Sequence, residues 1–385
     1  MNTKASDVYK MLPDAKKILL FNQLQLAKGA GSYSYHSGDY INISDMSMLI
    51  TSYGVVEAKI LQGAVTISDM YIAYAVAMLG VTDVVSISKY LKWLHKQYPE
   101  KRIPHQLEMG SLKNRVAALA RTGILRVSDI YTSNDKKIAN AISISDIGAK
   151  VVKRKLSMEK MSYDAWALTD TTAKIYARII TAKILCSIID NTPADILSIN
   201  TSVSLYDKNS AAKRGVLGEV IFGNDNRQSI YYIEPVTFQV DKSIKTELEN
   251  TNDIMDRVNM YASIINEAEL ENNDINIIFV VDDMESMQKI ISQIKTLGKN
   301  FAKHCLFTTE RLIQANEGRL YRSFYSLKLE SNEDGTESTR IPLDIDHPDI
   351  FGVEDYKRIN LRFKDLCDLG LATICDEENE KLVAG

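Results

Sequence analysis

The change of hydrophobic period within residues 68–157 constrains the fold of this chain more than any other feature. Three stretches with apolar residues at helical spacing come first, and two short stretches with strand character follow, at about Leu125–Tyr131 and Lys137–Ser145. The polar tip Thr132–Lys136 separates the two strands, and a further helical stretch comes after them. This part of the chain therefore predicts three helices, a two-stranded hairpin and a fourth helix.

Capping residues give the expected ends of these helices. Ser68 and Asp69 suit the start of the first helix, and Gly80 suits its end. We expect the third helix to begin near Ser111 and to stop at Gly123. For the second helix, Ser86 precedes a single apolar face formed by Ile87, Tyr90, Leu91, Leu94 and Tyr98. The order helix, helix, helix, hairpin, helix is that of a winged helix-turn-helix.

The run Ala141-Ile-Ser-Ile-Ser-Asp-Ile-Gly148 covers the end of the second predicted strand and the residues after it. It resembles the strand-to-helix junction of bacterial winged-helix proteins, in which a Leu-Thr-x-x-Gly pattern is common. In this run Ser145, Asp146 and Gly148 would start the fourth helix. The resemblance implies a DNA-binding domain over residues 67–157.

The charge of the chain is distributed unevenly. The whole chain has 46 Lys and Arg, 50 Asp and Glu and a net charge of -4. Residues 86–155 alone hold 15 basic and 5 acidic residues, a net charge of +10, which leaves -14 for the remainder. A basic segment of this kind suits duplex DNA, although a solvated helical face has the same composition.

The third predicted helix carries polar side chains opposite its apolar face. Leu112, Val116 and Leu119 face inward, and this leaves Ala117 and several polar residues on the other side. Asn and Arg can read base edges, while Lys mostly contacts phosphate. We expect DNA contacts from this helix, from the loop before it and from the hairpin, which together supply Lys101, Arg102, Lys113, Asn114, Arg115, Arg121, Lys136 and Lys137.

Residues 158–327 alternate helices and strands. The predicted order is helix, three meandering strands, helix, strand, helix, strand, which is the order of the restriction-endonuclease-like fold. The expected elements are a helix over Ser162–Asp190, strands over Ile196–Leu205, Val216–Phe222 and Ile230–Val240, a helix over Ile244–Leu270, a strand over Ile275–Val281, a helix from Met287 to Leu297 and a strand over Cys305–Thr308. The fold class is thus multi-domain α/β.

Two glutamates occupy positions where active nucleases of this fold hold a divalent metal. Glu219 lies on the second strand and Glu234 on the third. An active member carries Glu-x-Lys on the third strand, but here Val236 stands in place of the lysine, and Pro235 should disturb a central strand. We therefore expect an inactive domain with no bound metal and no cofactor. A metal-dependent nuclease using Glu219 and Glu234 stays open as an alternative.

A basic winged helix followed by a degenerate nuclease-like domain resembles the replication-relaxation family of mobile-element proteins. The resemblance covers about residues 65–310 and rests on the order of domains, on the strand Tyr231–Phe238 and on the downstream helix with Tyr261. It implies an accessory role at an origin of plasmid replication or transfer, with a relaxase or a replication protein as partner. A winged-helix transcriptional regulator and a protein-interaction scaffold are the other hypotheses.

The flanking segments are less informative. Residues 1–66 contain a predicted helix, Asp14–Lys28, and a Gly- and Tyr-rich loop, Gly29–Asp39, which is either a turn packed through Tyr33, Tyr35 and Tyr40 or a mobile arm. Residues 328–385 form an acidic extension with a predicted loop, Ser331–Ser338, and a predicted helix, Glu354–Leu369.

Other functional classes lack their signatures. The chain has no phosphate-binding glycine loop, no clustered His and no Cys-x-x-Cys among its four cysteines. Its apolar stretches are too short for a membrane helix, and the N-terminus shows no secretory signal. We expect a cytoplasmic homodimer that binds double-stranded DNA and has no contact with a membrane.

Overall fold

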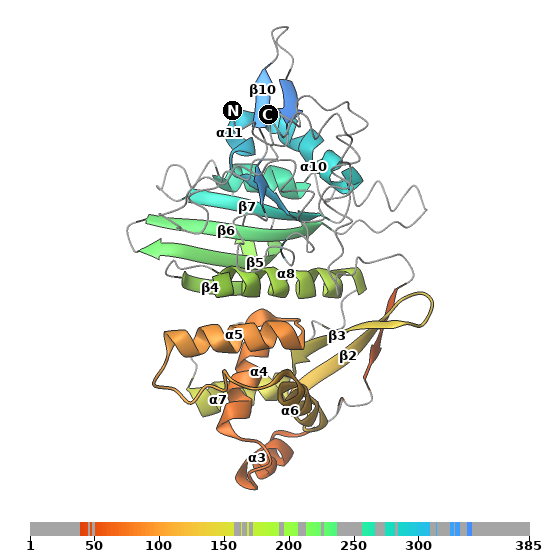
Figure 1. The fold of residues 1–385 in the computed structure, drawn as a ribbon, viewed down its shortest axis with the longest axis vertical. Helices are drawn as coiled ribbons and strands as arrows, with labels where there is room; N and C mark the ends of the chain where they lie inside the picture. The colour runs from red at the N-terminus through yellow and green to blue at the C-terminus, as the bar shows by residue number, and fades with distance from the viewer. Residues whose placement is uncertain are drawn as a thin grey trace, which may run out of the picture.

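The computed structural model combines helices and sheets in two stacked units (Figure 1). We call residues 39–157 the N-terminal unit and residues 172–326 the sheet unit. None of the helices in the described part of the chain has the length and apolar character needed to cross a membrane. The structure describes residues 39–44, 47, 51–157, 163, 168, 172–191, 196–206, 213–224, 227–236, 256–265, 274–281, 284–308, 313, 324–326, 328–331 and 337–340.

The N-terminal unit contains the predicted order of elements. Its helices are α4 (Ile67–Leu79), α5 (Val84–Gln97), α6 (Met109–Arg121) and α7 (Asp146–Leu156), and its hairpin is β2 (Leu125–Tyr131) with β3 (Lys137–Ile144). The two strands are antiparallel, with Leu125 opposite Ile144. Between α4 and α5, Thr82 forms an isolated antiparallel bridge to Ile142 of β3. The segment that joins the first two helices is therefore fastened to the hairpin.

Two predicted helix starts were wrong by two or three residues. Thr66, not Ser68, caps α4: the backbone N–H of Asp69 donates to the Thr66 hydroxyl, and the Thr66 N–H donates to the Asp69 carboxylate at 2.7 Å. Asp83, not Ser86, caps α5, because its carboxylate accepts from the Ser86 N–H at 2.7 Å. The residues chosen as caps lie inside the first turn, where their N–H groups need acceptors.

The start of α7 agrees with the sequence. The Ser145 hydroxyl accepts from the Gly148 N–H at 2.9 Å, as the predicted cap requires. Gly148 passes very close to Ile124, and a Cβ atom at this position would lie 2.1 Å from the Ile124 carbonyl oxygen. The glycine of the junction run is thus needed for close packing of α7 on the strand entry.

Two elements of the N-terminal unit were not predicted. Strand β1 (Tyr40–Ile43) pairs antiparallel with β2, which gives a sheet of order β1-β2-β3. Helix α3 (Tyr53–Leu61) is capped by Ser52. The ring of Tyr40 stacks on Tyr131 at a centroid distance of 5.4 Å, so this tyrosine is packed. The expectations for Asp14–Lys28 and for Tyr33 and Tyr35 fall outside the described residues.

The sheet unit is built on six strands in the order β4-β5-β6-β7-β8-β9. Strands β4, β5 and β6 form an antiparallel meander, β7 and β8 continue parallel to β6, and β9 is antiparallel to β8. The bounds are Ile196–Tyr206, Lys213–Asn224, Arg227–Val236, Asp274–Val281, Cys305–Thr308 and Tyr325–Ser326. The predicted strands are present, and β5 and β6 extend toward each other to form a longer hairpin.

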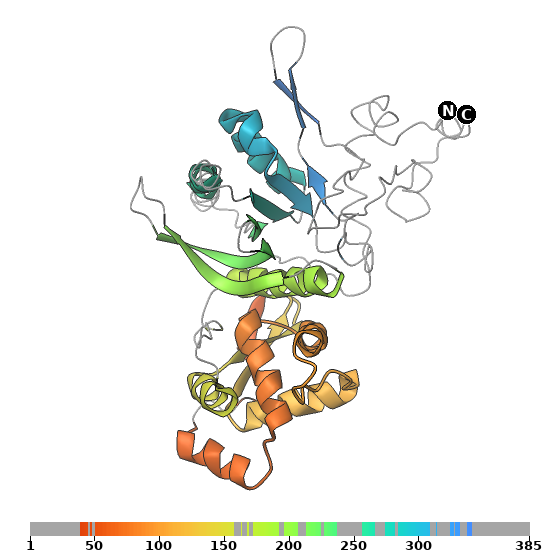
Figure 2. The ribbon, with the colours of Figure 1, turned by 90° about the vertical axis from the view of Figure 1, so that its left-hand side faces the viewer.

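Helices cover both faces of this sheet. Helix α8 (Thr172–Asn191) lies on one face, and residues 256–265 form a helix on the other (Figure 2). The predicted start of α8 at Ser162 was too early, since the described Tyr163 and Leu168 are not part of it. Helices α10 (Met284–Leu297) and α11 (Lys299–Ala302) connect β7 to β8.

The acidic C-terminal extension also differs from the prediction. Strands β10 (Lys328–Ser331) and β11 (Glu337–Arg340) pair antiparallel, so the ends of the predicted loop Ser331–Ser338 belong to strands. The predicted helix Glu354–Leu369 lies outside the described residues.

Helix α8 joins the two units. It packs on α5 as well as on the sheet, and the buried Cys186 thiol donates to the Ser86 carbonyl oxygen at 3.3 Å. The hydroxyl of Thr201 on β4 donates to the Met78 carbonyl oxygen of α4 at 3.0 Å. One core cluster of buried side chains runs from Val56 to Phe324. The N-terminal unit is therefore packed onto the sheet unit rather than merely tethered to it.

Candidate nucleic-acid interface

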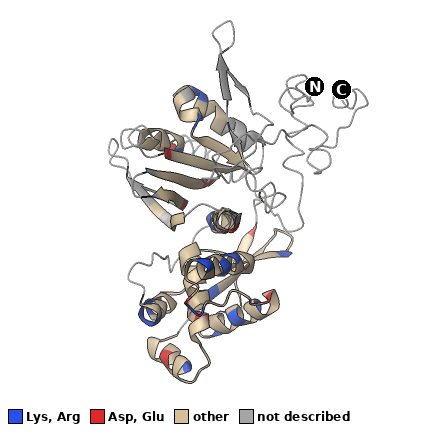
Figure 3. Ribbon diagram, turned by 60° about the vertical axis from the view of Figure 1, so that its left-hand side comes forward, with Lys and Arg blue, Asp and Glu red and all other residues tan. Residues whose placement is uncertain are grey.

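Helix α6 separates its apolar and polar side chains as predicted. Leu112, Val116 and Leu119 are buried against the unit, with Leu112 and Leu119 only 1% exposed. Lys113, Asn114 and Arg121 are exposed. Lys and Arg residues recur along α5, α6 and α7 of this unit, as the blue segments of the ribbon show (Figure 3). The outer side of α6 is a polar, cationic helical face that no described element covers.

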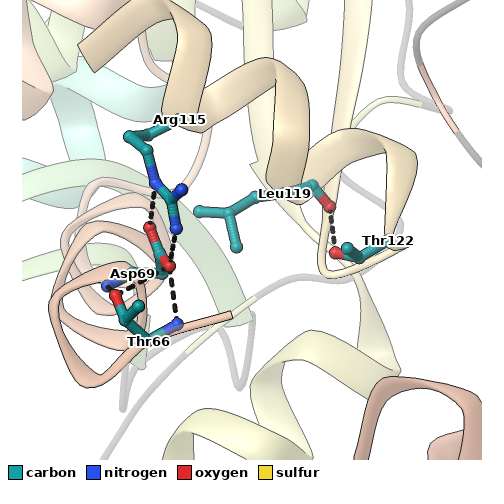
Figure 4. Close-up of polar contacts among 5 residues, drawn as sticks. All are labelled: Thr66, Asp69, Arg115, Leu119 and Thr122. Carbon is teal, nitrogen blue, oxygen red and sulfur yellow. Dashed lines mark hydrogen bonds and ion pairs between the residues drawn. The ribbon is translucent and has the colours of Figure 1, made fainter. Parts of the chain in front are cut away.

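Arg115 lies on the same helix but is bound by protein (Figure 4). Its Nε donates to Asp69 Oδ1 at 2.6 Å, and its Nη2 contacts Asp69 Oδ2. The Asp69 side chain is 1% exposed, and the ion pair raises the pKa of Arg115. This carboxylate also accepts from the hydroxyl of Thr66 at 2.8 Å. Arg115 thereby fixes α6 to the first turn of α4, a contact within the protein that the sequence-based expectation of a DNA contact for Arg115 did not include.

The hairpin tip carries two further predicted residues. Lys136 and Lys137 are both exposed, and Lys137 also pairs with Asp129 Oδ1 at 2.9 Å. Asp135 has a positive φ of 58° and accepts from the Tyr40 hydroxyl at 2.6 Å. Strand β1 thus supports the tip from one side, and both lysines of the tip are exposed.

The loop between α5 and α6 holds the last predicted pair. Arg102 is exposed, and the Lys101 ammonium lies 4.4 Å from the centre of the Tyr98 ring. Sequence reasoning missed the contact between His95 and His105, whose rings stack 3.5 Å apart across this loop. The two histidines are ten residues apart with no shared motif, so only the folded loop brings them together.

The sheet unit places the two candidate metal ligands on one face. Glu219 is opposite Tyr232 in the β5–β6 register, and Glu234 is two residues beyond Tyr232 on β6. Both glutamates are buried, at 7% and 5% exposure. Buried carboxylates of this kind need donors or a cation nearby.

Protein donors supply what these carboxylates need. Asn200 Nδ2 donates to Glu219 at 2.6 Å, and burial together with Glu219 raises the pKa of Tyr232. The Tyr261 hydroxyl donates to Glu234 at 2.7 Å, and Arg257 forms an ion pair with the same side chain. Among the described residues, no group of three His, Cys, Asp or Glu side chains could hold a metal ion.

Pro235 does not interrupt β6, contrary to the sequence-based expectation. The strand continues to Val236, and Pro235 pairs in register with Val280 of β7. The pairing between β5 and β6 ends at Gly218 and Ile233. At Pro235, β6 therefore has no paired residue in β5 on its other side. A missing N–H can be accommodated at such a position.

Comparison with models of protein families, with curated proteins and with solved structures gives no match to this chain. The resemblance to the replication-relaxation family therefore stays a prediction, and the function has to be argued from the geometry described above.

Proposed function

We propose that this protein binds duplex DNA through the exposed face of α6. The observation that carries the proposal is an amphipathic helix whose outer side presents Lys113, Asn114 and Arg121, in a segment with a net charge of +10. A helix of this kind fits the major groove, where Asn and Arg read base edges and Lys contacts phosphate.

The order of elements supports a winged helix-turn-helix. Helix α4, the Thr82 bridge to β3, α5, α6 and the hairpin β2–β3 follow one another as that fold requires. In this assignment α6 is the recognition helix and the hairpin is the wing. Lys136 on the wing and Arg102 in the loop before α6 would contact the phosphate backbone.

Arg115 has a positioning role in this proposal. Its ion pair with Asp69 holds the recognition helix against α4, so the orientation of Lys113 and Arg121 depends on a contact on the other side of the helix. Such preorganisation reduces the ordering that binding requires.

For the sheet unit we propose a restriction-endonuclease-like domain without nuclease activity. The order of α8, the β4–β6 meander, the helix at 256–265 and the parallel strands β7 and β8 supports the fold. The engagement of Glu219 and Glu234 by Asn200, Tyr261 and Arg257 supports the absence of metal-dependent cleavage. Incubation with supercoiled plasmid and Mg²⁺ or Mn²⁺ tests this part, and cleavage that Glu234→Ala abolishes would contradict it.

The cellular role that fits a DNA-binding, non-cleaving protein is that of an accessory factor. We propose action at an origin of replication or transfer, in the cytoplasm, with a relaxase or replication protein recruited through the sheet unit. Co-purification with such a partner from cells that carry the element tests this step separately from DNA binding.

The first experiment on the proposed function is selection of duplexes from a random-sequence library, followed by anisotropy titrations of the selected and a scrambled duplex. We expect tighter binding of the selected duplex and an affinity that falls with salt. Absence of enrichment together with absence of salt-dependent binding would overturn the proposal and would favour a protein-interaction scaffold.

A further inference from the structure

Four residues of α6 form a narrow stripe along the side of the helix that faces away from the core. They are Gly110, Asn114, Ala117 and Arg121, and we call them the α6 stripe. Successive residues lie about 100° apart around a helix, so the four directions fall within an arc of about 60°. Gly110, Asn114 and Arg121 are exposed, and Ala117 is half-buried. A ligand that lies along this side of α6 therefore meets all four residues.

Only two side chains of the α6 stripe reach far from the helix. Gly110 has no side chain, and a Cβ atom at its position would meet no atom of a neighbouring element within 4 Å. Ala117 has a single methyl group. Arg115 is not available, because Asp69 of α4 holds its guanidinium (Figure 4). The groups left to contact a ligand are the amide of Asn114 and the guanidinium of Arg121, and within the described part of the chain neither has a hydrogen bond or an ion pair.

We propose that the α6 stripe reads an adenine and a guanine that lie two or three base pairs apart in one major groove. The inference rests on the proposed DNA binding and adds the identity and spacing of the bases. In the major groove Asn forms two hydrogen bonds with adenine, through N6 and N7, and Arg forms two with guanine, through O6 and N7. Asn114 therefore selects adenine, and Arg121 selects guanine.

The spacing of the two bases follows from the spacing of the two side chains. Asn114 and Arg121 are seven residues apart, which is about 10.5 Å along the helix axis. They point in directions that differ by only about 20°. Base pairs are stacked about 3.4 Å apart, and the groove runs obliquely around the duplex, so the two side chains reach bases about two or three pairs apart.

Ala117 lies between the two reading side chains. Its methyl group is the kind of apolar contact that the C5-methyl group of thymine receives in the major groove. We therefore expect a base pair with thymine between the adenine and the guanine. Gly110 leaves the same side of the helix low at its other end, so the backbone of α6 can approach the bases closely.

The acidic N-terminus of α6 favours a helix that lies along the groove. Glu108 is the N-cap residue, its side chain is exposed and it forms no capping hydrogen bond. A helix that entered the groove with its N-terminus first would carry this carboxylate between the phosphates, which repel it. A helix along the groove brings Arg121, in the last turn, to the base edges. Lys113 lies about 80° from Arg121 around the helix and so contacts phosphate at the groove wall.

The test replaces single base pairs in the selected duplex and measures affinity by competition anisotropy for the parent, Asn114→Ala and Arg121→Ala. In the parent, replacing the adenine or the guanine should weaken binding about tenfold. Asn114→Ala should bind all base pairs equally at the adenine position and keep its preference at the guanine position, and Arg121→Ala should show the reverse. Both side chains are exposed, so the urea midpoints of the variants should match that of the parent.

Lys113→Ala is the matched control on the same helix. It should weaken every duplex by the same factor, because a phosphate contact carries no information about the base. Replacing the central thymine by uracil removes only a methyl group and should weaken the parent about threefold. Equal binding of the uracil duplex would reject the role of Ala117.

Three results would overturn the inference and leave DNA binding intact. The first is salt-dependent binding by the parent without any base preference. The second is a pair of variants, Asn114→Ala and Arg121→Ala, that weaken every duplex alike. The third is relaxed preference at bases other than adenine and guanine, or at positions more than about three base pairs apart. Absence of salt-dependent binding to any duplex would instead contradict the proposed function, and this inference with it.

Discussion

The charged side chains of the two candidate sites, one in the N-terminal unit and one in the sheet unit, lie in opposite environments. On α6, Lys113 and Arg121 are exposed and face outward from the fold. On β5 and β6, Glu219 and Glu234 are buried and bound by side chains from β4 and from the helix at 256–265. The candidate site residues of the N-terminal unit are thus accessible to a ligand. Those of the sheet unit are bound by other side chains of the fold.

The difference shows why residue type alone is a poor guide to a functional site. A buried carboxylate loses its hydration and has to recover the free energy through donors, so its partners are part of the fold. An exposed lysine remains hydrated and contributes little to folding, so it is free to bind an anion. Arg115 illustrates the intermediate case, since it lies on α6, the helix that we propose binds DNA, but is held by a buried aspartate.

The largest expected effect is that of Glu234→Ala. This substitution leaves Tyr261 without its acceptor and Arg257 without its counter-ion in a buried site. We expect the free energy of unfolding to fall by about 3 kcal/mol. This is at the low end for breaking a buried ion pair, because Arg257 is 32% exposed and solvent screens its charge. Urea denaturation measures it, and Tyr261→Phe, which removes only one hydrogen bond, should cost about 1 kcal/mol. A loss below about 0.5 kcal/mol for Glu234→Ala would show that the acid is not structural.

The next effect is that of Arg115→Ala, which leaves the Asp69 carboxylate buried without its ion pair. We expect a loss of about 2 kcal/mol, because Thr66 still satisfies part of the carboxylate and Arg115 is 37% exposed. Thermal and urea unfolding provide the measurement, with Arg121→Ala as the control on the same helix, expected within about 0.5 kcal/mol of the parent. If Arg115→Ala and Arg121→Ala are equally stable, the proposed positioning role of Arg115 is wrong.

The smallest effect concerns acid pH. Hydrogen bonds with Tyr53 and Lys155 lower the pKa of Glu57, and the bond with Lys150 is the main cause of the lowered pKa of Asp146. A carboxyl group whose pKa is lower in the folded state stabilises the fold above its ordinary pKa, 4.5 and 3.8 here, and loses this contribution as the pH falls through the folded value.

Urea denaturation at neutral pH and at about pH 3 should therefore show a smaller loss on acidification for the double variant Glu57→Gln, Asp146→Asn than for the parent. Identical pH dependence in the two proteins would mean that these surface contacts do not stabilise the fold.

The sequence predicted those features that depend on neighbouring residues. The order of α4, α5, α6, β2, β3 and α7 follows from local hydrophobic period, and the bounds of β2 were exact because the polar tip Thr132–Lys136 marks its end. Helix α3 was missed because Val55 and Leu61 point outward while Val56 points inward, so its apolar residues do not form one face.

The missed features depend on residues far apart in the chain. Strand β1 exists through its pairing with β2, in which Tyr40 is opposite Tyr131. The role of Arg115 depends on Asp69, 46 residues away, and that of Glu234 on Tyr261, 27 residues away. No local pattern marks such pairs, so the exposed part of the candidate interface was predictable and the internal part was not.

The most direct test of DNA binding by α6 is the salt dependence of affinity for the selected duplex, measured by anisotropy for three proteins. These are the parent, the double variant Lys113→Ala, Arg121→Ala, and Lys295→Ala, which removes an exposed lysine on α10 of the sheet unit. We predict that the double variant binds at least about tenfold more weakly and that its slope of log affinity against log salt falls by about one to two, while Lys295→Ala matches the parent. A double variant with the affinity and slope of the parent would contradict the assignment of α6 as the DNA-binding helix.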